Sequence, residues 1–160
     1  MNNKRRLIAV DPGEQHVGVA IFERDTSGLW SCTATQEFSP SRFVELFDMW
    51  TRADLFGVVV FERFILEPGR APMLVGSEME TSQMIGVIKY LVGQTIGGRV
   101  KLIGQTNKVK RPALAWAESV KYRFTSVREG SGGHCKDAEL HGVYAIARSL
   151  QEPLFSAIDR

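Results

Sequence analysis

Residues 7–22, LIAVDPGEQHVGVAIF, decide the fold. The apolar run at residues 7–10 suits a buried strand, and the Asp-Pro-Gly that follows interrupts it, because Pro and Gly punctuate turns. Residues 17–22 resume an extended pattern, so the two segments are predicted to pair as a hairpin. A third strand is predicted at residues 31–38, after a turn at residues 25–28.

Helices alternate with strands in the rest of the chain. Ser39 followed by Pro40 is a typical helix start, with a capping side chain before a proline at the first helical position. Residues 57–61, GVVVF, are apolar on both faces, as in a central strand. The remaining predicted elements are helices at 40–50, 81–92, 107–122 and 134–150 and a strand at 100–103. Residues 1–160 are therefore predicted to form one α/β domain: a mixed five-stranded sheet, its first three strands antiparallel, with helices on both faces.

Composition excludes several classes of protein. The 160 residues are 44% hydrophobic and 24% charged, as in ordinary soluble globular proteins. The sequence has no apolar run of about 18 residues or more, so no membrane span is expected, and its first apolar run is too short for a signal peptide. Cys32 and Cys135 are too few for a disulfide framework or a structural zinc site. A reducing, cytoplasmic setting is therefore expected.

Positive charge is concentrated in residues 99–130, which hold eight Lys and Arg against two Glu, a net charge of +6. Residues 1–98 carry −3 and residues 131–160 carry −1. Such an asymmetry is expected where one face of a protein meets phosphates. The alternative is a helix with a solvated basic face, and charge alone favours neither explanation.

Three acidic residues stand at the ends of predicted elements. Asp11 follows the first strand, Glu62 follows the strand at 57–61, and Asp137 lies in the first turn of the last helix. Burying a carboxylate is costly unless it is paired or binds a metal, and Mg²⁺ prefers hard oxygen ligands. His134 and His141, three residues before Asp137 and four after it, would share its helix face. We therefore expect the three acids to converge on a divalent metal ion.

Each of these residues also has a structural explanation. Asp11 before Pro-Gly is a common turn former, and Glu62 could form an ion pair with Arg63. Asp137 could stabilise its helix N-terminus, and His141 is expected to be packed or solvated rather than a ligand. These explanations serve the residues singly and leave their common pattern unexplained.

Three stretches of the chain resemble the RuvC-type Holliday-junction resolvases of the RNase H-like superfamily. LIAVDPGEQHVGVAIFE resembles the family's opening hairpin, with Asp11, and VVVFERFIL resembles the strand that ends in its catalytic glutamate, at Glu62. GHCKDAELHGVYAIA resembles its last helix, where two acidic residues stand three apart; here these positions hold His134 and Asp137, as in some members. The resemblance spans residues 7–150, and the short, divergent chain is more similar to phage and mobile-element members than to housekeeping bacterial ones.

The resemblance implies an endonuclease that resolves four-way junctions by phosphodiester hydrolysis, with two Mg²⁺ or Mn²⁺ ions in each active site. Asp11 would bridge the two ions, Glu62 would bind one, and His134 with Asp137 would bind the other. A histidine ligand favours Mn²⁺ alongside Mg²⁺. The implied location is the cytoplasm of a bacterial or phage-infected cell.

The resemblance also implies the DNA contacts. QTNKVK at residues 105–110 resembles the family segment with a phosphate-facing lysine, so Lys108 or Lys110, together with Arg111, would contact phosphates. The loop at residues 65–77 would lie near the active site, where Arg70 would contact DNA. Phe64 would stack in an opened junction, with a buried core position as the alternative.

Family members are symmetric homodimers, because a four-way junction needs two matched cuts. The predicted interface is the second helix, at Met79, Met84, Ile85 and Ile88, although core packing would also account for these residues. Three other interpretations are a broader nuclease for flaps and replication forks, an RNase H-like module that holds DNA without cutting it, and an actin-like nucleotide-binding fold. The last shares the hairpin but needs a second, similar domain, for which 160 residues are too few.

Overall fold

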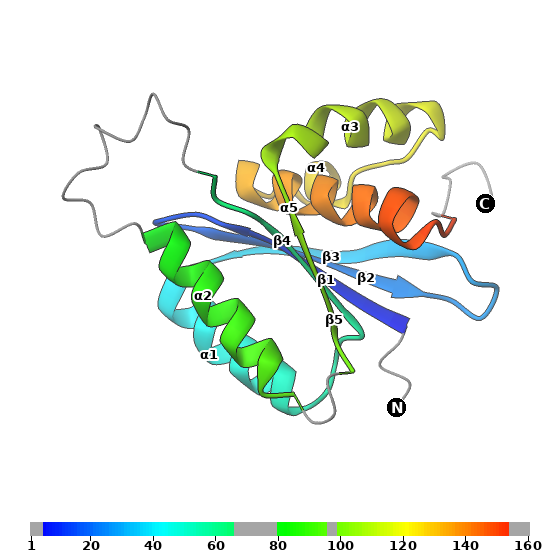
Figure 1. The fold of residues 1–160 in the computed structure, drawn as a ribbon. Helices are drawn as coiled ribbons and strands as arrows, with labels where there is room; N and C mark the ends of the chain where they lie inside the picture. The colour runs from blue at the N-terminus through cyan, green and yellow to red at the C-terminus, as the bar shows by residue number, and fades with distance from the viewer. Residues whose placement is uncertain (1–4, 66–79, 96–98, 154–160) are drawn as a thin grey trace.

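The computed structural model describes residues 5–65, 80–95 and 99–153. Their five strands form one sheet in the order β3-β2-β1-β4-β5. The strands are β1 (Arg6–Pro12), β2 (Val17–Arg24), β3 (Trp30–Phe38), β4 (Val58–Glu62) and β5 (Lys101–Gln105). The first three pair antiparallel, and β4 and β5 continue the sheet parallel to β1 (Figure 1). The predicted mixed sheet is confirmed.

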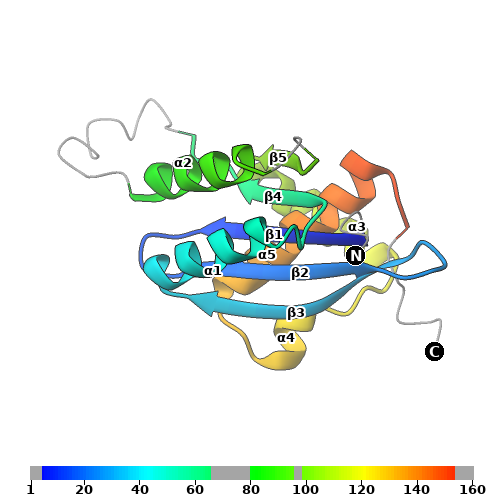
Figure 2. The ribbon, with the colours of Figure 1, turned by 90° about the horizontal axis from the view of Figure 1, so that it is seen from below.

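Helices cover both faces of the sheet (Figures 1 and 2). One face carries α1 (Pro40–Arg52) and α2 (Glu80–Gly93); the other carries α3 (Lys110–Ser119), α4 (Thr125–Glu129) and α5 (Gly133–Tyr144). A 3₁₀ turn, η4 (Asn107–Val109), leads into α3, and a π-helical turn, η5 (Ala145–Leu150), continues α5. The two long helices predicted at 107–122 and 134–150 are thus each divided, and α4 was not predicted.

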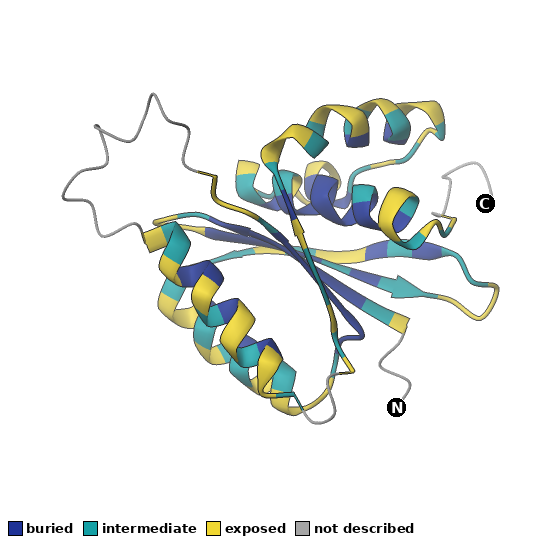
Figure 3. Ribbon diagram, in the orientation of Figure 1, coloured by how far each residue is buried: buried dark blue, intermediate teal, exposed yellow. Residues whose placement is uncertain are grey.

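Alternation along the strands divides the core into two clusters, because successive side chains point to opposite faces of a sheet. Leu7 and Ala9 of β1 pack with residues of α3 and α5, whereas Ile8 and Val10 pack with residues of α1 and α2. Figure 3 shows the result: the central strands are mostly buried, and each long helix is exposed on its outer side. Residues of one strand with the same parity therefore share a face.

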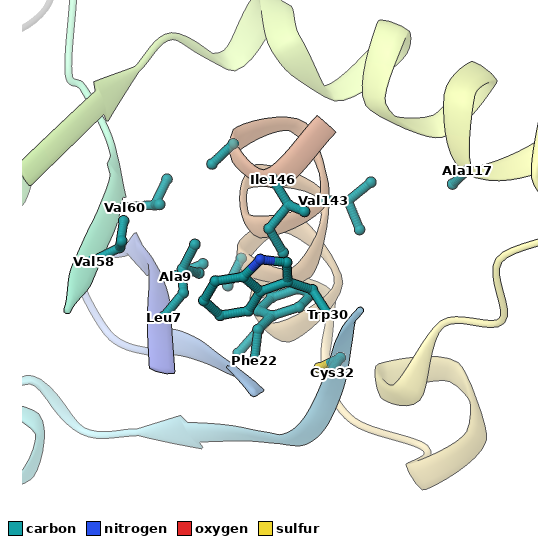
Figure 4. Close-up of a cluster of buried hydrophobic side chains, with 13 residues drawn as sticks. Leu7, Ala9, Phe22, Trp30, Cys32, Val58, Val60, Ala117, Val143 and Ile146 are labelled. Carbon is teal, nitrogen blue, oxygen red and sulfur yellow. The ribbon is translucent and has the colours of Figure 1, made fainter. Parts of the chain in front are cut away.

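Large side chains fill the cluster between the sheet and α5. Trp30 and Phe22 occupy its centre, with Val143 of α5 and Ile146 of η5 beside them (Figure 4). Gly142 lets α5 approach this cluster closely, since a Cβ at that position would lie 2.2 Å from the Phe22 ring. The position of α5, which matters for the site below, is therefore set by packing on β2.

The apolar residues of the last helix differ in how far they are buried. Leu140 and Val143 are buried, but Tyr144, Ala147 and Leu150 are only partly so. The physical reason is that α5 contacts the sheet, α3 and α4 at once. Its buried surface therefore extends around most of the helix instead of following one stripe.

The residues predicted for a subunit interface belong to the core. Met84, Ile85 and Ile88 of α2 are buried in the cluster beneath α1 and α2, which confirms the core-packing alternative for them. Met79 lies outside the described residues. In the described part of the chain, no helix has the length and apolar character needed to cross a membrane. The homodimer itself stays a prediction.

Candidate active site

Three parallel strands carry polar side chains to one edge of the sheet. Asp11, Glu62 and Gln105 stand at the carboxyl ends of β1, β4 and β5, and the register places Glu62 beside Gln105. Asp11 has the parity of Leu7 and Ala9, so it faces α5, and the same rule puts Glu62 on that face. Strand direction and alternation together thus bring these side chains to one corner under α5.

The helix α5 supplies the opposite side of the site. His134 and His141 lie three residues before Asp137 and four after it; the two histidines contact strand-end acids, and Asp137 contacts Lys110. His134 Nδ1 is 2.7 Å from Asp11 Oδ2, and His141 Nε2 is 3.0 Å from Glu62 Oε2.

Lys110 joins two of the carboxylates. Its Nζ, at the start of α3, lies 2.7 Å from Asp137 Oδ2 and 2.8 Å from Glu62 Oε2. Of the two lysines predicted to face phosphate, Lys110 therefore lies inside the site, whereas Lys108 is exposed. A single ammonium group holds the acid of α5 against the acid of β4.

Glycines in the first hairpin allow α5 to come this close. Gly18 pairs with Asp11 in the hairpin, and a Cβ on it would lie 2.1 Å from the carbonyl oxygen of His134. A Cβ on Gly13 would lie 2.9 Å from Cε1 of the His134 ring. The N-terminus of α5 therefore rests directly on the hairpin backbone, which brings His134 within hydrogen-bonding reach of Asp11.

The charges of the site are unevenly compensated. Burial raises the pKa of Asp11, and the nearby Glu62 adds to this, while the hydrogen bond with His134 and the charge of Lys110 oppose it. Burial also acts to raise the pKa of Glu62, but hydrogen bonds from His141 and Lys110 outweigh it and lower that pKa to about 2. Burial disfavours the charged form of Lys110, yet its hydrogen bonds to Asp137 and Glu62 raise its pKa. Of Asp11 and Glu62, Asp11 is therefore the acid whose ionised form is less favoured.

The donor set fits a divalent cation, although it does not form a finished metal site. Among the described residues, no three His, Cys, Asp or Glu side chains are grouped so that they could hold a metal ion. Lys110 lies between Glu62 and Asp137 instead. The set nevertheless offers three carboxylates and the His134 nitrogen, and the ammonium group of Lys110 already lies between two of these carboxylates. It also contains Asp11, whose ionised form is disfavoured by burial. The carboxylates are hard oxygen ligands of the kind that Mg²⁺ and Mn²⁺ prefer.

The other predicted DNA-contacting residues have varied positions. Phe64, two residues beyond Glu62, is 40% exposed, so the alternative of a buried core position is wrong. Lys108 and Arg111 are exposed on either side of Lys110. Arg70 lies outside the described residues.

Two polar residues of the site were not predicted as such. His141 was expected to be packed or solvated, and it is indeed fully buried; its hydrogen bond with Glu62 was not predicted. Gln105 was considered only as part of a lysine-bearing segment, yet its side chain hydrogen-bonds His141 at 2.8 Å. One signal was available: Gln105 ends an apolar strand, as Asp11 and Glu62 do.

No family model and no curated protein sequence matches this chain. Solved structures do match it. Thermus thermophilus RuvC in complex with a Holliday junction substrate matches with a TM-score of 0.61 and 12% identity, over 92% of this chain and 98% of that one. The fowlpox virus Holliday junction resolvase matches with a TM-score of 0.56 and 15% identity, over 91% of this chain and 99% of that one. The yeast mitochondrial Holliday junction resolvase matches with a TM-score of 0.51 and 13% identity, over 88% of this chain and 77% of that one. The chain therefore has the RNase H-like fold of the RuvC-type Holliday junction resolvases, as predicted.

Proposed function

We propose that this protein is a divalent-metal-dependent endonuclease that cuts branched DNA, with four-way junctions as its main substrate. One observation carries the proposal: Asp11, Glu62 and the α5 face with His134 and Asp137 meet at one edge of the sheet. The fold supports it, because the RuvC, fowlpox virus and yeast mitochondrial structures that match are Holliday junction resolvases, and the RuvC structure contains a junction substrate.

The metal ligands in this proposal are Asp11, Glu62, Asp137 and His134, which would hold two Mg²⁺ or Mn²⁺ ions. When bound, such ions activate the attacking water and stabilise the leaving oxygen of a phosphodiester. The protein's own contribution is to orient these ligands. His134 fixes Asp11 by a hydrogen bond, and Lys110 fixes Asp137 and supplies positive charge beside the position of the reacting phosphate.

DNA would approach along the start of α3. Lys108 and Arg111 are exposed next to Lys110, so they can meet backbone phosphates on either side of the reacting one. Phe64 projects from the end of β4 close to Glu62 and is available to stack on an unpaired base at the junction centre. Two matched cuts require two such sites, and we therefore propose a homodimer, which sedimentation of the protein with and without junction DNA would test.

A cleavage assay on synthetic four-way, flap and linear DNA, with Mg²⁺ or Mn²⁺, tests the activity. The parent protein should cut the four-way substrate fastest, and Asp11→Asn should bind it without cutting. If Asp11→Asn still cuts the junction, Asp11 is not a metal ligand of the active site and the proposed site is wrong. Binding without cleavage by the parent protein would favour a non-cleaving module, and equal cutting of flaps and junctions would favour a broader branched-DNA nuclease.

The salt dependence of junction binding tests the phosphate contacts. Replacing Lys108 and Arg111 together by Ala should reduce the slope of log K against log salt by about 2, since each phosphate contact contributes roughly 0.9. Lys101→Ala is the matched control, because Lys101 is exposed at the opposite end of β5 from the site. An unchanged slope in the double variant would exclude these two residues from the DNA interface.

A further inference from the structure

The most deeply buried polar group next to the site is the His141 imidazole, which is 0% exposed. Its two ring nitrogens have different partners: Nε2 lies 3.0 Å from Glu62 Oε2, and Nδ1 lies 2.8 Å from the Gln105 side-chain oxygen. Gln105 is itself only 6% exposed, and its amide nitrogen is the one buried side-chain polar atom without a partner in the described part of the chain.

The partners of the ring constrain where its protons sit. An ionised Glu62 can only accept hydrogen bonds, so Nε2 must carry a hydrogen. If Nδ1 also carried one, to reach the Gln105 oxygen, the buried Gln105 amide group would keep its donors without a partner. Such unused donors are costly in a buried environment, and orphaned buried N–H groups are rarer than under-used carbonyl oxygens.

A half-turn of the Gln105 amide removes this cost. The two ends of a side-chain amide have the same shape, so the surrounding hydrogen bonds decide which end is the nitrogen. With the nitrogen facing the ring, Gln105 donates to Nδ1, and the neutral ring donates from Nε2 to Glu62. We infer that Gln105 and His141 form a buried relay that fixes the neutral Nε2–H tautomer of His141 and makes it a positioning residue for Glu62.

The relay determines which oxygen of Glu62 is used. His141 and Lys110 both hydrogen-bond Oε2, and neither of these contacts uses Oε1. The carboxylate is thus held at one oxygen from two elements, α5 and α3. Partners of this kind orient metal ligands in other proteins, and losing one typically weakens metal binding 10- to 100-fold. This last step rests on the proposed function, whereas the tautomer does not.

Nitrogen-15 NMR of the metal-free protein, labelled at its histidines, tests the relay directly. The neutral Nε2–H form of His141 should give two well-separated ring-nitrogen resonances, with the protonated one assigned to Nε2. Gln105→Glu places an acceptor beside Nδ1 and should convert the ring to the doubly protonated form, whose two resonances lie close together. A doubly protonated ring or an Nδ1–H tautomer in the parent protein would overturn the inference.

Calorimetric titration with Mn²⁺ tests the positioning role. His141→Leu should bind Mn²⁺ about 10- to 100-fold more weakly than the parent protein, and His141→Gln, which keeps a donor for Glu62, should recover most of the affinity. Parent-like binding by a folded His141→Leu variant would refute the role. Gln105→Leu, which keeps the ring, gives the same comparison if His141→Leu does not fold. A parent protein that binds no Mn²⁺ refutes the proposed metal site, while the NMR result still decides the relay.

Discussion

Replacing Gly18 by Ala should damage both stability and the candidate active site through one steric contact. The added Cβ would lie 2.2 Å from the carbonyl carbon of His134 and 2.8 Å from the backbone nitrogen of Cys135, whereas ordinary contact begins at 3.4 Å. Both neighbours are backbone atoms at the N-terminus of α5, so no side-chain rotation can relieve the clash. The start of α5 must retreat from β2 by about 1 Å.

The expected loss of stability is about 1–3 kcal/mol, the usual cost of overpacking. For a chain of this size, that loss corresponds to a Tm lower by roughly 2–12 °C. The same retreat would stretch the 2.7 Å contact between His134 and Asp11 beyond hydrogen-bond length. Misplacement of a reacting group by about 1 Å can cost 10²-fold in rate, so cleavage should fall more steeply than folding.

Thermal unfolding and junction cleavage, measured on the same samples, check this expectation. Gly86→Ala in α2 is the control, because a Cβ at Gly86 meets nothing within 4 Å and Ala favours a helix. Its Tm should be unchanged or higher, with parent-like cleavage. If Gly18→Ala unfolds at the same temperature as Gly86→Ala and cuts as fast, then α5 does not depend on the hairpin glycine for its position.

Three more substitutions test separate parts of the structure. Glu139→Ala should destabilise the protein by about 3 kcal/mol or more in chemical denaturation, because several buried donors around α4 lose their acceptor, and a smaller loss would contradict that role. Lys110→Met should lower the Tm without metal and enlarge the rise in Tm caused by Mn²⁺, since Glu62 and Asp137 lose their shared cation; equal metal-induced rises in variant and parent would contradict this. Phe64→Ala should leave the Tm nearly unchanged and slow junction cleavage by an amount equivalent to about 1–3 kcal/mol, and unchanged cleavage would exclude stacking.

The parts of the fold that local patterns encode could be predicted from the sequence. The hairpin around Asp11, the central strand that ends at Glu62 and the shared face of His134, Asp137 and His141 follow from period-2 and period-3.6 spacing. The same local patterns place Asp11 and Glu62 at strand ends and Asp137 at a helix start, and these positions were the reason to expect that the three acids meet.

The parts that depend on distant partners could not be predicted in this way. The short helix α4 has its first backbone N–H groups, at Thr125 and Ser126, bound by the carboxylate of Glu139 on α5. Nothing in residues 125–129 alone signals that support. The contact between Gln105 and His141 similarly requires the register of β5 and the docking of α5 together.

The contacts that complete the candidate site bridge very long stretches of chain: 123 residues separate His134 from Asp11, and 79 separate His141 from Glu62. Contacts of such high order form only when the whole topology is in place. A partly unfolded or newly made chain would therefore lack hydrolytic chemistry altogether instead of cutting DNA indiscriminately. For the proposed endonuclease, the absence of cutting by an immature chain would then come from the topology itself, without any separate inhibitor.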